Sequence, residues 1–175
     1  MGLGISSLAI LIRPSHHPAM NTPSEEFKYL LAALAEQTGL DQLEIDENGA
    51  CALQFDDRIT VYLVEIEEEG SVRLVSDLGP PVEEVGQVAL SQAMLEANWL
   101  GSGTHGATLS IEPGTSNVCL WRQVSLAALT PVSFTDLLGQ FVDTAESWMA
   151  LINAELPPNS AEGISSLGHP VGIPA

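Results

Sequence analysis

The sequence has 175 residues, and its 23 Asp and Glu against 5 Lys and Arg give a formal net charge of −18 at pH 7. With 45% hydrophobic residues, it is too apolar for a disordered acidic tail. It has too few cations to bind nucleic acid or an anionic membrane through phosphate groups. No apolar run reaches the roughly 18–20 residues that span a bilayer. These properties predict a soluble globular domain with an acidic surface.

The two ends of the sequence differ from its middle. Residues 1–21 contain a short apolar run, Leu8–Ile12, without the preceding basic residues of a secretory signal. Met20 stands just before the first predicted helix and is an alternative start. Residues 157–175 are rich in Pro and Gly, which is typical of a disordered linker. We therefore expect a disordered extension at 1–21, a single domain at 22–156 and a disordered tail at 157–175.

The first half of the domain predicts one helix and three strands. Thr22-Pro23-Ser24-Glu25 is typical of a capping box, and the apolar spacing after it predicts a helix over 23–38 that ends at Gly39. Alternating residues predict strands over 51–55, 58–66 and 72–75, which tight turns make antiparallel neighbours. The second strand is apolar on both faces, so its second face is either open to a partner or covered by the last helix.

The second half predicts a helix over 82–100, strands over 107–111 and 118–126, and a final helix from a cap at Ser133–Asp136 to about residue 155. The helix over 82–100 has two apolar stripes, formed by Val85, Val88, Leu95 and Trp99 and by Leu90, Met94 and Ala97. A face this wide has its own sheet to cover and, in one interpretation, a partner. The order α-β-β-β-α-β-β-α predicts an α+β fold, with helices packed on an antiparallel twisted sheet.

Two patterns imitate cofactor- or metal-binding motifs but lack their context. Gly101, Gly103 and Gly106 spell the dinucleotide-loop pattern, yet a helix precedes them and a strand follows, the reverse of the order that nucleotide binding needs. The segment from Glu44 to Gly49 resembles the start of a calcium loop, but its twelfth position is Phe55. An acidic turn is the simpler interpretation. We therefore predict no enzyme, cofactor or metal site.

The two cysteines are Cys51 and Cys119, and both stand in strand-like runs. They are too few and too far apart in sequence for a disulfide framework or a set of metal ligands. Free cysteines of this kind are usually buried, so we expect two reduced thiols in the core.

Several segments together resemble the class I type III secretion chaperones. The first is Asp46-x-x-Gly49-x-Cys51-x-Leu53-x-Phe55-Asp56, after a capped helix. The others are Met94–Asn98 at the end of the second helix, Gly106–Ile111, Val118-x-Leu120-x-Arg122, and the final helix with Phe134, Leu137, Leu138, Phe141 and Trp148. The resemblance covers about residues 22–155. It implies a homodimeric cytoplasmic chaperone of a Gram-negative bacterium, without ATP or metal of its own.

The resemblance also implies a function and two surfaces. Such proteins hold an N-terminal segment of a secreted effector in an extended form and deliver it to the secretion ATPase. The candidates for client binding are Tyr62, Val64, Ile66, Phe27 and Leu31. The family's dimer contact lies around the second helix and the following strand, and here it points to Val88, Gln92, Leu95 and Trp99, although Trp99 is alternatively part of the chain's own core. The acidic surface would keep such a protein soluble and attract basic effector segments.

Two other functions remain open on the sequence alone. The charge also fits an acidic inhibitor or immunity-type protein that mimics nucleic acid, which predicts acids clustered on one face. A small hydrolase that uses His105 with a nearby acid is a further alternative.

Overall fold

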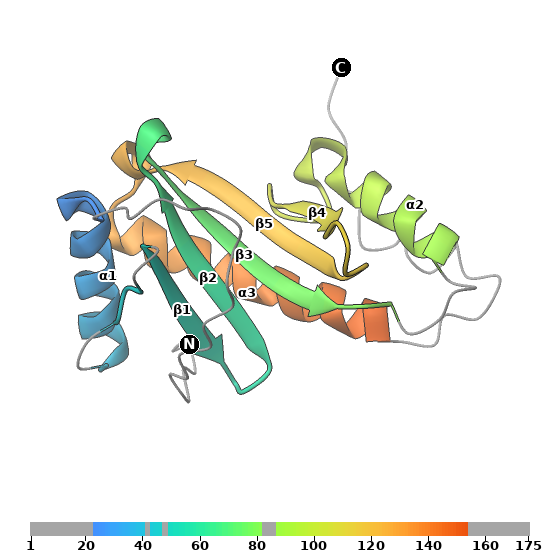
Figure 1. The fold of residues 1–175 in the computed structure, drawn as a ribbon, viewed down its shortest axis with the longest axis horizontal. Coiled ribbons are helices and arrows are strands. Elements are labelled where there is room, and N and C mark those ends of the chain that lie inside the picture. The colour runs from blue at the N-terminus through green and yellow to red at the C-terminus, as the bar shows by residue number, and fades with distance from the viewer. Residues whose placement is uncertain (1–22, 41–42, 47–48, 82–86, 154–175) are drawn as a thin grey trace, which may run out of the picture. The chain divides into compact units, whose positions relative to one another are not determined.

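The computed structural model describes residues 23–40, 43–46, 49–81 and 87–153 (Figure 1). They form α1 (Glu25–Thr38), β1 (Ala50–Phe55), β2 (Ile59–Ile66), β3 (Ser71–Gly79), α2 (Gln87–Asn98), β4 (Thr108–Ile111), β5 (Val118–Ser125) and α3 (Pro131–Asn153). This order is the predicted one. The expected tails at 1–21 and 157–175 and the start of the predicted helix over 82–100 lie outside the described residues. Within the described part, none of the helices has the length and apolar character needed to cross a membrane.

The five strands form one sheet in the order β1-β2-β3-β5-β4, so β1 and β4 are its two edge strands. The pairs β1–β2, β2–β3 and β4–β5 are antiparallel. The chain forms two compact units, and β3, β5 and α3 are each divided between them. The first unit contains the residues up to Ser76 together with Arg122–Val142, and the second contains Asp77–Trp121 together with the residues from Asp143 onward.

The core of the first unit lies on one face of β1, β2 and β3. Alternate residues of β2 are fully buried, namely Ile59, Val61 and Leu63, and Phe27 of α1 and Phe134 of α3 are equally buried. In Figure 1 the first half of α3 passes behind β1, β2 and β3, and no described helix lies in front of them. The second face of β2, with Tyr62, Val64 and Ile66, is only half-buried. The sheet of this unit therefore has one helix-covered face and one open face.

Both long helices begin at residues that differ from the prediction. The N-cap of α1 is Ser24, whose Oγ accepts a hydrogen bond from the Phe27 N–H at 3.2 Å. In α3 the N-cap is Thr130, because Ser133 donates its N–H to Thr130 Oγ1 at 3.2 Å and accepts the Thr130 N–H at 2.9 Å. The predicted cap at Ser133–Asp136 was therefore wrong by one turn. Pro131 accounts for the shift, since its fixed φ suits the first helical position.

The second unit is built around the connection between α2 and β4. Its core contains Leu90, Ala93 and Met94 of α2, Leu109 of β4, Val118 and Leu120 of β5, and Ala145, Trp148 and Ile152 of α3. Gly103 donates its N–H to the Ala97 carbonyl at 3.1 Å and accepts the Trp148 indole N–H at 3.0 Å. A Cβ at Gly103 would lie 2.7 Å from the Ala97 Cβ. The loop follows a helix and precedes a strand, as predicted, and its glycine at 103 serves close packing.

Candidate functional site

One side of α2 carries large apolar side chains that the described chain leaves in solvent. Val88 is 80% exposed, and Leu95 and Trp99 are each 72% exposed. Leu100 follows the helix in the left-handed region, at φ 54°, and is 86% exposed. We call these four residues together with Gln92 the α2 strip. Contiguous exposed apolar surface of this kind commonly marks a protein interaction site.

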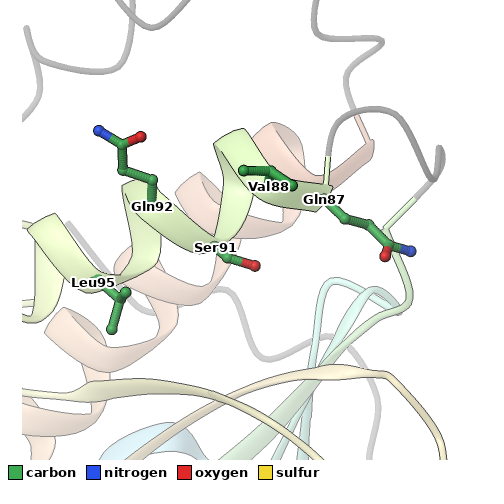
Figure 2. Close-up of a pocket in the computed structure, with 5 residues that line it drawn as sticks. All are labelled: Gln87, Val88, Ser91, Gln92 and Leu95. Atoms are coloured by element: carbon green, nitrogen blue, oxygen red, sulfur yellow. The ribbon is translucent and has the colours of Figure 1, made fainter.

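Spacing along the helix explains how the α2 strip arises. Val88, Gln92, Leu95 and Trp99 recur at intervals of three and four residues, so they share a face, while Leu90, Ala93 and Met94 point into the core. Figure 2 shows Val88, Gln92 and Leu95 with Gln87 and Ser91 lining an open depression along this helix. Gln92 is held by Glu96, to whose Oε1 it donates at 2.9 Å. All four predicted dimer residues therefore lie on one exposed face, and Trp99 is not part of the chain's own core.

The open sheet face of the first unit brings three of the five predicted client residues together. Tyr62, Val64 and Ile66 alternate along β2, and the residues opposite Tyr62 and Val64 on β1 are Ala52 and Ala50. We call Ala50, Ala52, Tyr62, Val64 and Ile66 the open face. Because alanine has no side chain beyond Cβ, the Tyr62 and Val64 side chains are accessible across β1 from the edge of the sheet.

The edge of β1 beside the open face has backbone groups that no other described residue binds. Ala50 donates its N–H to Asp46 Oδ1 at 2.9 Å, and its carbonyl accepts the Asp46 N–H at 2.8 Å. The backbone N–H and C=O of Ala50 therefore point away from β2. Because backbone groups alternate in direction along an antiparallel pair, the N–H and C=O of Ala52 and of Gln54 point away from β2 as well. Their outward N–H and C=O groups bind no other described residue. We call these groups of Ala52 and Gln54 the β1 edge.

The remaining two client candidates lie elsewhere. Phe27 is 0% exposed and Leu31 is 3% exposed, because both side chains of α1 are part of the core of the first unit. Their helical spacing is a signal of burial as much as of binding, and sequence reasoning did not separate the two. Sequence reasoning also missed Leu100 and the β1 edge. The alanines at 50 and 52 were the available signal for that edge.

A polar network lies on β3 and β5 within the first unit. Arg73 donates from Nη2 to Gln123 Oε1 at 2.7 Å and from Nε at 3.1 Å. The Gln123 amide then donates to Ser71 Oγ at 2.9 Å and to the Glu69 carboxylate. These bonds use the guanidinium of one of the chain's few cations to join two neighbouring strands. The network therefore has a structural role.

The motifs that imitate chemistry have structural roles here. Asp46 is held by Ala50, as described above, and among the described residues no group of three His, Cys, Asp or Glu side chains is placed to hold a metal ion. His105 Nδ1 lies 3.0 Å from Thr144 Oγ1 on α3. His105 thus joins the α2–β4 connection to the second half of α3.

The two thiols have different surroundings. Cys51 is 1% exposed, and its burial, followed by the negative charge of Asp46, raises the pKa of its thiol to about 12. Cys119 is only half-buried, because it points to the face of β5 opposite the buried Val118 and Leu120. Both thiols were predicted to lie in the core, but only Cys51 is a core residue.

Comparison with known proteins gives matches over most of the described chain. The model of the Tir chaperone protein (CesT) family matches residues 29–149. The transcriptional anti-antiactivator ExsC of Pseudomonas aeruginosa is 28% identical over 140 residues, which are 79% of this chain and 92% of ExsC.

Solved structures agree with these matches. A chain of the ExsC–ExsE complex has a TM-score of 0.63 at 26% identity, covering 75% of this chain and 96% of its own length. A chain of the HopA1–SchA chaperone–effector complex has a TM-score of 0.61 at 14% identity, covering 71% and 94%. The Yersinia pestis type III secretion chaperone SycH, in complex with a fragment of YscM2, gives 0.56 at 24%, covering 69% and 98%. The predicted α+β fold is thereby confirmed.

Proposed function

Because the chain belongs to the Tir chaperone protein (CesT) family of type III secretion chaperones, we propose that it binds an N-terminal segment of one or more secreted effectors. It keeps that segment extended and competent for secretion, and it brings the segment to the secretion ATPase. The work is done by binding alone, in the bacterial cytoplasm, without a cofactor or metal. The observation that carries this proposal is the β1 edge lying beside the open face.

The β1 edge supports capture of an extended segment. An added strand pairs its backbone with the outward N–H and C=O groups of Ala52 and Gln54, which supplies affinity for any sequence. Its alternate side chains then lie over Ala52 and reach Tyr62 and Val64, which supplies selectivity for apolar residues at every second position. An unfolded client offers both features, whereas a folded one hides them.

Charge supports the choice of client. The chain has 18 more acidic than basic residues, and Asp46, Asp56 and Asp57 flank the two ends of β1. A basic segment is attracted to such an edge, and the attraction acts mainly on the association rate. The same charge opposes self-association of a protein that leaves apolar surface exposed.

The α2 strip supports a homodimer. Its four apolar side chains are too exposed to contribute to this chain's core, and a second copy would bury them against an equivalent surface in a two-fold arrangement. Gln92, in the middle of the strip, supplies a polar group that can fix the register of two copies.

The test of client binding compares two tyrosines in copurification and calorimetry. N-terminal segments of the effectors secreted by the same bacterium are coexpressed with the chain, and the binding of each captured segment is measured. Tyr62→Ala should weaken binding by about tenfold or more, since it removes an aromatic anchor. Tyr29→Ala, an aromatic 63% exposed on α1 and outside the open face, is the matched control. Failure of every segment to bind contradicts the chaperone function, and equal effects of the two variants contradict the site.

A second candidate function is control of transcription through capture of a protein partner. ExsC, named as a transcriptional anti-antiactivator, shares 28% identity with this chain over nearly its whole length. Its solved complex with ExsE shows that such a protein holds another protein. Deleting the gene should then change transcript levels of the secretion genes even when secretion itself is blocked. Unchanged transcript levels would contradict the regulatory role, and effector binding would remain as the proposed function.

The acidic inhibitor remains an alternative to these functions only on grounds of charge. It predicts binding to a basic nucleic-acid enzyme through side-chain charge, with no need for the β1 edge. Family membership favours the chaperone.

A further inference from the structure

The two edge strands of the sheet differ in how their outward backbone groups are bonded. On β4, both edge groups of Leu109 are bound by one side chain. Asn98 Nδ2 donates to the Leu109 carbonyl at 3.0 Å, and Asn98 Oδ1 accepts the Leu109 N–H at 2.9 Å. The side-chain amide thus takes the place that the peptide group of a neighbouring strand would occupy.

Thr104 binds both backbone groups of Ala107, two residues earlier along the chain, through its hydroxyl and its own carbonyl. Thr104 Oγ1 donates to the Ala107 carbonyl at 2.6 Å, and the Ala107 N–H donates to the Thr104 carbonyl at 3.0 Å. Leu109 lies opposite Leu120 of β5, but its backbone groups bind Asn98 instead. Because backbone groups alternate in direction along a strand, those of Ala107, Leu109 and Ile111 all point outward from this edge. Two of these three positions are therefore closed, one by Asn98 at the end of α2 and one by Thr104 in the α2–β4 connection.

The α2–β4 connection has an unusual backbone conformation. Leu100, Gly101, His105 and Gly106 all have φ between 50° and 81°, the left-handed region that costs energy for the two non-glycine residues. Thr104 is 1% exposed and Asn98 is half-buried, so their hydrogen bonds are partly shielded from water. On β1 the pattern is the opposite. Asp46 binds the outward backbone groups of Ala50, but no described residue binds those of Ala52 and Gln54.

We propose that Asn98 and Thr104 determine which end of the sheet accepts an extended segment. Asn98 closes the β4 edge with its side chain and Thr104 with its hydroxyl and backbone carbonyl, and together they direct strand addition to the β1 edge. A strand that approached β4 would have to displace the Asn98 amide and break both of its bonds before forming its own. The preference for β1 rests on the proposed function, but the closure of β4 does not.

Amide hydrogen exchange tests the closure without any client. Asn98→Ala should speed exchange of the Leu109 N–H by about tenfold or more, since that group would face water without a partner. Exchange of the Leu120 N–H should stay near its wild-type rate, which separates a local opening from a general loss of stability. Ser102→Ala is the matched control, because Ser102 lies in the same connection and its Oγ donates to the Trp99 carbonyl at 3.0 Å, away from the β4 edge groups.

Sedimentation velocity over a concentration series tests the consequence for strand addition. The double variant Asn98→Ala/Thr104→Val should form species larger than those of the wild type, because two opened β4 edges can pair with each other. Unchanged Leu109 exchange overturns the proposal. Faster exchange without new association also overturns it, since the edge would then be open and still not accept a strand.

If Asn98→Ala does not fold, Asn98→Leu takes its place. That variant keeps a side chain of similar size and offers no group that binds the Leu109 N–H or carbonyl, so the same faster exchange of the Leu109 N–H is expected. Because neither measurement involves an effector, failure of client binding and failure of edge closure give different results.

Discussion

The carboxylate of Glu65 on β2 accepts a hydrogen bond of 2.8 Å from the backbone N–H of Ser24, the residue that caps α1. In a capping box, a Glu or Gln three residues into the helix would bind that N–H, but Phe27 holds this position and is buried in the core. A strand residue 41 positions away replaces it. The start of α1 is thereby attached to the sheet whose edge we propose for client binding.

We predict that Glu65→Ala lowers the free energy of unfolding by about 1–3 kcal/mol. The change leaves a part-buried N–H at the helix start without its partner. Chemical denaturation measures the loss. Glu68→Ala, an exposed acid in the following turn, is the matched control and should change the free energy of unfolding by less than about 0.5 kcal/mol. Equal effects of the two variants would contradict the role of Glu65.

For the proposed dimer, Trp99→Glu should shift the protein toward the monomer in size-exclusion chromatography with light scattering. A charge in the α2 strip would have to be buried without a partner when two copies meet. Far-UV circular dichroism should keep its helix signal, because Trp99 is 72% exposed in the single chain. Tyr29→Glu is the control for adding charge at an exposed aromatic. A dimer that persists in Trp99→Glu contradicts the interface.

Gly103→Ala should destabilise the second unit. Its new Cβ would lie 2.7 Å from the Ala97 Cβ and 3.0 Å from the Ala97 Cα, which lies in the backbone and cannot move aside cheaply. We expect a loss of about 1–3 kcal/mol in the free energy of unfolding, the usual cost of overpacking. The companion variant Ala97→Gly with Gly103→Ala removes the side-chain part of the clash. It should regain part of the stability, and a loss as large as that of Gly103→Ala alone would rule out the contact as the cause.

The raised pKa of Cys51 predicts a loss of stability at high pH. The ordinary pKa of a cysteine thiol is 9.0, and burial raises the pKa of Cys51 to about 12, so the folded state holds its proton more tightly. Below pH 9 the thiol keeps its proton in both the folded and the unfolded state, so its contribution to the free energy of unfolding is fully present. Between pH 9 and 12 the unfolded state loses the proton first, and the free energy of unfolding falls by up to about 1.4 kcal/mol per pH unit.

Urea unfolding of the wild type and of Cys51→Ala over this pH range measures that slope. Tyrosine and lysine titrate in both proteins and cancel in the comparison. Cys51→Ala should be less stable at neutral pH, because a small cavity replaces the thiol, but its stability should fall less steeply above pH 9. Parallel curves would contradict the raised pKa of Cys51.

The order of elements and the buried face of each strand could be predicted because they depend on local periodicity. The alternation in β2 and the helical spacing of Phe134, Leu138 and Phe141 are properties of neighbours in the chain, and the structure places all these residues as that spacing requires. The resemblance to secretion chaperones rested on the same local patterns, and the family match over residues 29–149 confirms it.

Tertiary structure alone decided which apolar residues stay available. Leu31 and Leu95 both belong to helical stripes, yet Leu31 is 3% exposed and Leu95 is 72% exposed, because packing buries one stripe of α1 and only one of the two stripes of α2. The pairing of Glu65 with Ser24 and of Asn98 with Leu109 joins residues whose separation in sequence carries no local signal. Sequence thus determined the strands and helices. Packing determined which of their edges and faces remain open, since that depends on where distant side chains come to lie.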